Sequence, residues 1–252
     1  MQAVIEQDRS KRVLQSTILV LCSLLLSACA TQPTTLTDPE RDPWEGFNRK
    51  THAFNTSVDN AVFKPVARGY DRVMPDGPQR GVRNFFNNLN WPVDFVNLIL
   101  QGRIRDSITE TGRFLVNSTI GLGGFFDVAT RSGYPDFNED LGQTMAVWGW
   151  KKSNYLVLPF LGPRTVRDTF GRSLYGYLSP VTYYAREKHN YVPLVIDLIS
   201  LRAELLPLEQ DIQGAEDPYV LIRDVYLQRR EFEIYNGNPP SPDYDALLED
   251  YE

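Results

Sequence analysis

The chain has 252 residues, and its 32 acidic against 26 basic side chains give a net charge of −6. This length suffices for one large or two small domains, and the acidic excess argues against a nucleic-acid partner and against electrostatic docking on anionic lipid. The two cysteines, Cys22 and Cys29, both lie near the N-terminus, so neither a disulfide nor a cysteine metal site is expected further along.

The N-terminal segment has the pattern of a secretory leader. Three basic residues between Arg9 and Arg12 precede an uncharged, largely apolar stretch from Val13 to Leu26. That stretch is shorter than the roughly 20 residues of a membrane span but suits a signal peptide. It closes with Leu26-Ser27-Ala28-Cys29, which resembles the lipobox of bacterial lipoproteins, where the cysteine is acylated after cleavage. We therefore predict a signal peptide over residues 1–28 and lipid on Cys29; the alternative is an ordinary leader beside an incidental cysteine.

Residues 29–41 are rich in Thr and Pro and lack apolar periodicity, which predicts a lipidated flexible tether. Ala30 stands where an aspartate would, by the usual sorting rule, retain a lipoprotein at the inner membrane. Alanine at this position therefore predicts that the lipoprotein is anchored in the outer membrane, on the periplasmic side. The folded domain is expected over residues 42–237.

Asp42-Pro43-Trp44-Glu45 predicts the first helix, with Asp42 as its cap, Pro43 at the first helical position and Glu45 completing a capping box. Apolar residues continue at helical spacing to Val62, and Lys64-Pro65 is expected to end the helix. Asp217-Pro218-Tyr219 predicts a second helix of this kind, ended by Asn236-Gly237-Asn238-Pro239.

Between these two helices, apolar periodicity predicts four more, over residues 78–88, 92–101, 103–119 and 192–206. Gly102 separates the second of these from the third, and residues 155–159 fit a short strand or an extended segment. Alternation typical of strands is otherwise rare, so we predict a mainly helical, all-α domain. Residues 238–252 are Pro-rich and then acidic, which predicts a disordered tail.

The chain lacks the common catalytic patterns. Its two histidines, His52 and His189, form no metal-binding motif, and Gly171-Arg172-Ser173-Leu174-Tyr175 lacks the last glycine of a hydrolase nucleophile elbow. Neither a phosphate-binding loop ending in Gly-Lys-Ser/Thr nor a dinucleotide-binding glycine spacing is present. We therefore expect no enzyme, no metal and no cofactor.

An apolar segment that contains three glycines extends from Ile120 to Ala129, and Asp127 is its one charged residue. One interpretation is a buried turn between two helices. The other is a backbone that bends tightly beside lipid or a pore, where glycine removes the side-chain obstruction.

Several motifs in order resemble those of the MlaA (VacJ) lipoprotein family. The likeness begins at Asp42-Pro43-Trp44-Glu45-Gly46-Phe47-Asn48-Arg49 and spans essentially the whole expected domain. The further motifs are Phe54-Asn55, Asn97-Leu98-Ile99-Leu100-Gln101-Gly102, Arg113-Phe114-Leu115-Val116-Asn117, Gly121-Leu122-Gly123-Gly124-Phe125-Phe126-Asp127-Val128-Ala129, Leu158-Pro159-Phe160-Leu161-Gly162, Asp217-Pro218-Tyr219 and Tyr226-Leu227-Gln228-Arg229-Arg230.

The resemblance implies a ring of amphipathic helices around a central channel, lying in the inner leaflet of the outer membrane beside a trimeric porin. Such proteins pass mislocalised phospholipids from the outer leaflet inward, to a soluble periplasmic carrier that feeds an ATP-driven inner-membrane transporter. The result is an asymmetric outer membrane. Two alternatives remain open, namely an envelope lipid hydrolase and a structural, porin-associated lipoprotein.

The resemblance also suggests two sets of functional residues. The wall of the channel or ring is expected at Phe54, Asn55, Asn117, Gly121, Gly123 and Gly124. Phe54 has the alternative of a core position, and Asn55 that of a cap. Docking of the carrier is expected on the last helix, at Tyr219, Arg223, Arg229 and Arg230, and in the acidic tail.

Overall fold

A computed structural model describes residues 38–240 and confirms a mainly helical domain. The predicted signal peptide, Cys29, the tether before residue 38 and the tail from residue 241 lie outside the described residues. The helices are α2 (Glu45–Val58), α3 (Lys64–Val73), α4 (Asp76–Leu89), α5 (Trp91–Leu100), α6 (Ile104–Thr119), α7 (Val128–Arg131), α8 (Leu141–Val147), α9 (Val166–Leu178), α10 (Pro180–Lys188), α11 (Val192–Glu204), α12 (Glu209–Gly214) and α13 (Pro218–Ile234).

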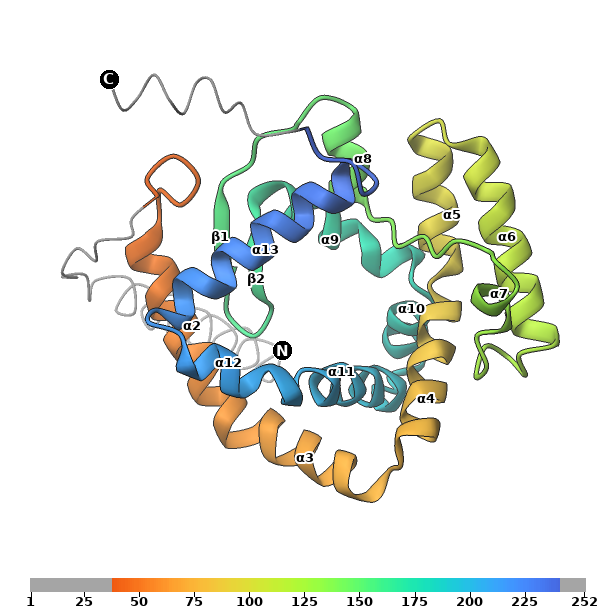
Figure 1. The fold of residues 1–252 in the computed structure, drawn as a ribbon, viewed down its shortest axis with the longest axis horizontal. Coiled ribbons are helices and arrows are strands. Elements are labelled where there is room, and N and C mark those ends of the chain that lie inside the picture. Colours follow the sequence, from red (N-terminus) through yellow and green to blue (C-terminus); the bar gives the residue numbers. More distant parts are fainter. Residues whose placement is uncertain (1–37, 241–252) are drawn as a thin grey trace, which may run out of the picture.

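The helices are arranged as a ring, as the resemblance implies (Figure 1). α2 and α3 form one arc, and α4 leads from it to the antiparallel pair α5 and α6. α11 packs against α3 and α4 on the side towards the middle of the ring, next to α10. α8, α9, α13 and a β-hairpin complete the circuit, because α13 contacts both α8 and the hairpin while α2 contacts the hairpin's first strand.

The start of α2 differs from the predicted capping box. The helix begins at Glu45 without a side-chain cap, and Asp42 is buried instead. Its carboxylate accepts hydrogen bonds from Asn48 Nδ2 at 2.7 Å and from the Tyr219 hydroxyl at 2.5 Å. Asp42 therefore ties the start of α2 to α13, a long-range role that local spacing does not reveal.

The folded body also begins earlier than residue 42. The Tyr155 N–H donates to the Arg41 carbonyl at 2.7 Å, and the Asp42 N–H donates to the Asp38 carbonyl at 2.7 Å. Arg41 thus pairs with the hairpin, and residues 38–41 belong to the folded body and not to a free tether.

The prediction that Lys64-Pro65 ends the first helix is wrong. A π-helical turn, Asp59–Phe63, joins α2 directly to α3, and the Lys64 N–H donates to the Asp59 carbonyl. Proline lacks an N–H and crowds the carbonyl four residues earlier, and a wider π-type turn accommodates such a defect. The chain therefore stays helical to Val73.

The other predicted helices are confirmed as α4, α5, α6, α11 and α13. Asp217 caps α13, accepting hydrogen bonds from the N–H groups of Tyr219 and Val220. Gly102 separates α5 from α6 with a φ of 77°, and Asn236 and Gly237 end α13 with φ of 51° and 85°. These are left-handed backbone conformations that favour glycine and asparagine.

The predicted strand is confirmed as β1 (Tyr155–Leu158), which pairs antiparallel with β2 (Gly162–Thr165). Two asparagines of α2 bind its backbone. Asn48 Oδ1 accepts from the Val157 N–H at 2.8 Å, and Asn55 Nδ2 donates to the Leu158 carbonyl at 2.9 Å. A small core of Tyr155, Val157, Tyr219 and Val220 lies between this strand and α13.

Candidate functional site

The polarity of α6 is the reverse of that in an ordinary soluble protein. Its buried face carries Ser107, Glu110, Arg113 and Asn117. Its apolar side chains are exposed, with Ile104 at 51%, Ile108 at 68% and Leu115 at 54%. Charged residues are seldom buried and large apolar ones seldom gathered on a surface, so this helix indicates a surface made for an apolar partner.

Other elements also expose large apolar side chains. α11 buries the small residues Ser200 and Ala203 while it exposes its larger aliphatic side chains. Within residues 38–240 no helix is both long and apolar enough to cross a membrane. Further exposed apolar residues are Val62, Val66, Val73, Ile120, Leu122, Phe125, Phe126, Val147, Trp148, Trp150, Phe160, Leu161, Val192, Val195, Ile196, Leu198 and Leu201.

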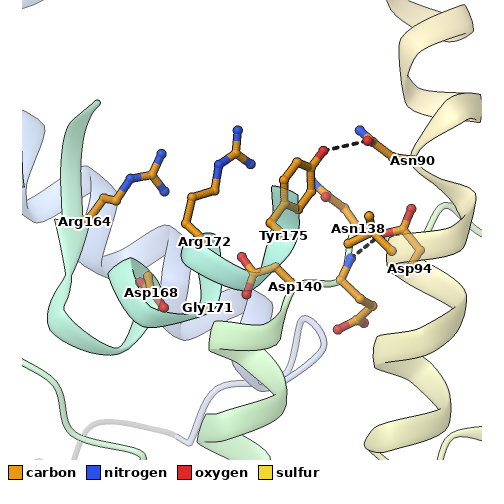
Figure 2. Close-up of a pocket in the computed structure, with 11 residues that line it drawn as sticks. Asn90, Asp94, Asn138, Asp140, Arg164, Asp168, Gly171, Arg172 and Tyr175 are labelled. Atoms are coloured by element: carbon orange, nitrogen blue, oxygen red, sulfur yellow. Dashed lines mark hydrogen bonds between the residues drawn. The ribbon is translucent and has the colours of Figure 1, made fainter. Parts of the chain in front are cut away.

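A polar pocket of about 570 Å³, open solvent included, lies where α9 approaches α5 and β2 (Figure 2). Gly142 and Gly171 allow α8 and α9 to approach closely, since a Cβ on Gly171 would lie 2.7 Å from the Gly142 nitrogen. Thr165 caps α9 and Asp140 caps α8. The lining residues are Asn90, Val93, Asp94, Asn138, Glu139, Asp140, Arg164, Asp168, Gly171, Arg172 and Tyr175.

Arginines on other parts of the chain neutralise three of the four carboxyl groups in this pocket. Arg230 of α13 bridges Asp140 and Asp168 at 3.0 and 2.9 Å. Arg167 also contacts Asp168, and Arg103 pairs with Glu139. Although burial opposes it, the charges of Arg230 and Arg167 lower the pKa of Asp168, so this carboxylate remains ionised.

Asp94 is the fourth carboxyl group, and burial disfavours its ionised form. Burial, opposed by a hydrogen bond from the Glu139 N–H, raises the pKa of Asp94 well above its usual value. The nearby carboxyl groups of Glu110, Glu139 and Asp136 raise it further. Asp94 is therefore protonated more readily than an ordinary aspartate.

Two arginines and a tyrosine line the remaining side of the pocket. Figure 2 shows the side chains of Arg164, Arg172 and Tyr175 projecting in the same direction from β2 and α9. The Arg172 guanidinium lies 4.1 Å from the centroid of the Tyr175 ring. The Tyr175 hydroxyl donates to Asn90 Oδ1 at 2.6 Å, which joins α9 to the residue before α5.

Of the residues expected in a ring wall, Phe54 and Asn55 lie beside the hairpin turn. Phe54 is exposed and packs edge-on against Phe160, with ring centroids 5.2 Å apart, so it is not a core residue. Asn55 neither caps a helix nor lines the pocket. Its amide binds Leu158 and also accepts from the Phe160 N–H at 2.8 Å, and so fixes the turn between β1 and β2.

The other four expected wall residues form the loop after α6. Asn117 is buried, donates to Asp127 and accepts from the Ala129 N–H at 2.9 Å. Gly121 and Gly124 lie in tight contacts, with Asn117 and Phe126 around the first and Asn88 beside the second, whereas Gly123 faces open space. The segment is thus a turn, as one interpretation held, but its apolar side chains at Ile120, Leu122, Phe125 and Phe126 are exposed rather than buried.

Three of the four residues expected to dock a carrier are buried. Tyr219 and Arg223 are 3% exposed and Arg230 is 8% exposed, and all three bind carboxylates within the ring. Arg229 alone of the four is exposed, where it pairs with Glu233. The structure therefore places the first three in the framework of the ring and leaves Arg229 available to a partner.

Sequence reasoning missed the pocket. Asp94, Asp140, Asp168 and Arg164 lie on different elements, and their convergence depends on the ring. One signal was present: Arg164 comes two residues after Leu158-Pro159-Phe160-Leu161-Gly162, a motif that already carried the family resemblance.

Together the fold and the site define an amphipathic ring of helices with a charged pocket. The family model of the MlaA lipoprotein matches residues 40–233, and the chain belongs to this family. A relative in Escherichia coli K12, the "Intermembrane phospholipid transport system lipoprotein MlaA", is 33% identical over 234 residues, which cover 91% of this chain and 92% of that one. An "Uncharacterized protein" of Rickettsia felis is 35% identical over 195 residues, or 77% and 78% of the two chains.

A solved structure is similar in fold as well as in sequence. It is described as "Structural basis for maintenance of bacterial outer membrane lipid asymmetry", and it superposes with a TM-score of 0.66 at 31% identity. The match covers 77% of this chain and 98% of the solved one.

Proposed function

We propose that this chain is an outer-membrane lipoprotein that moves phospholipids and so maintains the lipid asymmetry of the outer membrane. Family membership supports this function, since the relative in Escherichia coli is named for intermembrane phospholipid transport and the similar solved structure for lipid asymmetry. The observation that carries the proposal is the combination of a charged pocket with helices that expose large apolar side chains.

This combination meets the physical problem of moving a phospholipid. The roughly thirty methylenes of two acyl chains, at about 0.8 kcal/mol each, would cost on the order of 25 kcal/mol if exposed to water. The charged headgroup has the opposite need, because an unpaired charge is costly to bury in hydrocarbon. A protein with a polar, wet path beside apolar surface satisfies both needs without any covalent step.

The proposal has four finer parts. Cys29 carries the lipid that holds the chain on the periplasmic side of the outer membrane, and the ring lies in the inner leaflet around a central channel. Mislocalised phospholipids enter from the outer leaflet, and a soluble periplasmic carrier, contacted through Arg229, takes them towards an ATP-driven inner-membrane transporter. A trimeric porin holds the ring in place. The exposed apolar residues of α6 and α11 support the position in the leaflet.

Deletion of the gene tests the function. We expect more phospholipid in the outer leaflet, measured by a membrane-impermeant amine-reactive label, and sensitivity to detergent, both reversed by the wild-type gene. Normal surface phospholipid in the deletion strain would contradict the proposal.

A test on purified protein separates transport from the two alternatives. Incubation with radiolabelled phospholipid should yield intact lipid moved between vesicles, whereas released fatty acid would indicate a hydrolase. A purely structural role predicts neither product.

A further inference from the structure

Arg164 and Arg172 are the two basic residues that line the pocket, and they differ from its other charged groups in their contacts. Within residues 38–240 neither guanidinium forms an ion pair, and the buried Nε of Arg164 has no hydrogen-bond partner. The arginines that neutralise the pocket, Arg103, Arg167 and Arg230, are all bound to carboxylates. Arg172 is exposed, but Arg164 is partly buried, and a buried charge is normally paired.

The two arginines lie close enough to repel each other. Burial and the charge of Arg172 lower the pKa of Arg164, and the carboxylates of Asp168 and Asp140 offset this only in part. Both of those carboxylates already bind Arg230. These carboxylates and Asp197 act on the two arginines only through longer-range electrostatics, so both guanidinium groups can still bind an external anion directly.

The neighbouring groups suit a phosphate-containing ligand. Tyr175 holds Arg172 over its ring and is itself fixed by Asn90, so this guanidinium is oriented. Burial raises the pKa of Asp94 and so disfavours the ionised form that would oppose an anion. Two guanidinium groups presented side by side can offer forked, charge-assisted hydrogen bonds to the oxygens of a phosphodiester.

We propose that Arg164 and Arg172 bind the phosphate of a phospholipid headgroup, and that this pocket is the headgroup site of the ring. The inference rests on the proposed function for the choice of a lipid over another phosphate compound. The polar lining receives the headgroup, while the acyl chains remain on exposed apolar side chains outside the pocket.

Binding to the purified full-length lipoprotein tests the site. The protein is held in a phosphate-free nonionic detergent, and the probe is dihexanoyl-phosphatidylglycerol, titrated by calorimetry. We expect Arg164→Gln and Arg172→Gln each to weaken binding about tenfold or more, because each removes charge-assisted hydrogen bonds. The matched control is Arg80→Gln, an exposed arginine of α4 outside the pocket, which should bind as the wild type does.

Two further probes identify the part of the lipid that binds. Dihexanoylglycerol, which lacks the phosphate, should show no difference between wild type and variants. Inorganic phosphate should bind more weakly than the lipid. Phosphate binding as tight as that of the lipid, and lost in the same variants, would identify a site for free phosphate and overturn the headgroup assignment.

Thermal unfolding separates a binding role from a structural one. Because neither arginine forms an ion pair within the described part of the chain, Arg164→Gln should unfold at or above the wild-type temperature, and Arg172→Gln, which loses only its contact with the Tyr175 ring, close to it. Unchanged affinity for the lipid in both variants would overturn the proposal. If deletion of the gene still raised surface phospholipid, that result would leave the proposed function standing. Conversely, binding that depends on the arginines, together with normal surface phospholipid in the deletion strain, would count against transport and not against the site.

Discussion

At the level of single residues, the side-chain amides of three asparagines form hydrogen bonds that backbone groups of a neighbouring strand would otherwise form. Asn48 and Asn55 lie two turns apart on α2 and bind the exposed edge of β1, and Asn117 holds the loop after α6 in a similar way. An amide offers one acceptor and two donors, as an adjacent strand would, so these contacts satisfy a short edge strand. The sequence shows which positions are asparagines, but their partners are more than 100 residues away for α2 and depend on the closed ring.

Asn48→Ala should therefore destabilise the domain by about 2–4 kcal/mol, because it leaves the Val157 N–H and the Tyr155 carbonyl unpaired in a buried place. Asn87→Ala, at an exposed position of α4, is the control and should have little effect. Urea unfolding measures both, and equal stability of the two variants would contradict this role for Asn48.

Glu110 gives the fold a dependence on pH. Burial, together with the nearby carboxyl groups of Asp136 and Asp127, raises its pKa to about 8 against the opposing charge of Arg113. The folded state thus holds a proton that the unfolded chain releases near 4.5. Stability from this group is fully present below pH 4.5 and is lost as the pH rises through about 8.

Glu110→Gln stays neutral at every pH and should remove this loss. Relative to the wild type, we expect the variant to gain at least about 1.4 kcal/mol, the equivalent of one pKa unit, between mildly acidic and mildly alkaline buffer. Chemical unfolding at both pH values checks this. A difference between the two proteins that does not change with pH would contradict the assignment.

At the level of elements, the sequence predicts those helices that have strong apolar periodicity or a proline-based start. It does not predict α3, which begins at Lys64-Pro65, or α7, α8, α9, α10 and α12, which are short or mix glycine, aromatic and charged residues, so tertiary packing defines them. The prediction that the first helix ends at Pro65 is wrong because proline removes only one backbone hydrogen bond of a helix. The π-helical turn before it accommodates that loss, and the chain stays helical.

The loop after α6 leaves no room for a side chain at Gly121. A Cβ on Gly121 would lie 2.2 Å from the Phe126 carbonyl oxygen and 2.5 Å from that of Asn117, and neither backbone can move aside freely. Gly121→Ala should cost about 2 kcal/mol or more in unfolding free energy. Gly69→Ala in α3 meets nothing within 4 Å and should be neutral or stabilising by up to about 1 kcal/mol. If both variants unfolded alike, the packing argument would fail.

At the level of the whole molecule, helix packing decides which face of an amphipathic helix is buried. The sequence predicts that α6 is amphipathic, but periodicity is the same whichever face is buried. Only the packed arrangement shows that Glu110 and Arg113 are buried and that Ile104 and Ile108 are exposed. The pocket was unpredictable for the same reason, because it forms where four separate segments meet.

The exposed apolar face of α6 should bind lipid even without the anchor on Cys29. In a Cys29→Ser background, which removes the proposed anchor, Ile108→Ser should weaken binding to phospholipid vesicles about tenfold, since it removes an exposed apolar side chain of α6. Arg105→Ser, at an exposed charged position of the same helix, is the control. Vesicle flotation measures both, and equal binding by the two variants would contradict a lipid-facing α6.

The central claim is that phospholipid headgroups occupy the charged pocket of the ring. Photo-crosslinking in living cells tests it most directly, with a benzoylphenylalanine in place of Asn138 at the pocket or, as control, in place of Arg80 on α4. Mass spectrometry of the purified protein after illumination should find an intact phospholipid attached at the pocket position and not at the control. Lipid at neither position, or equally at both, would contradict the account.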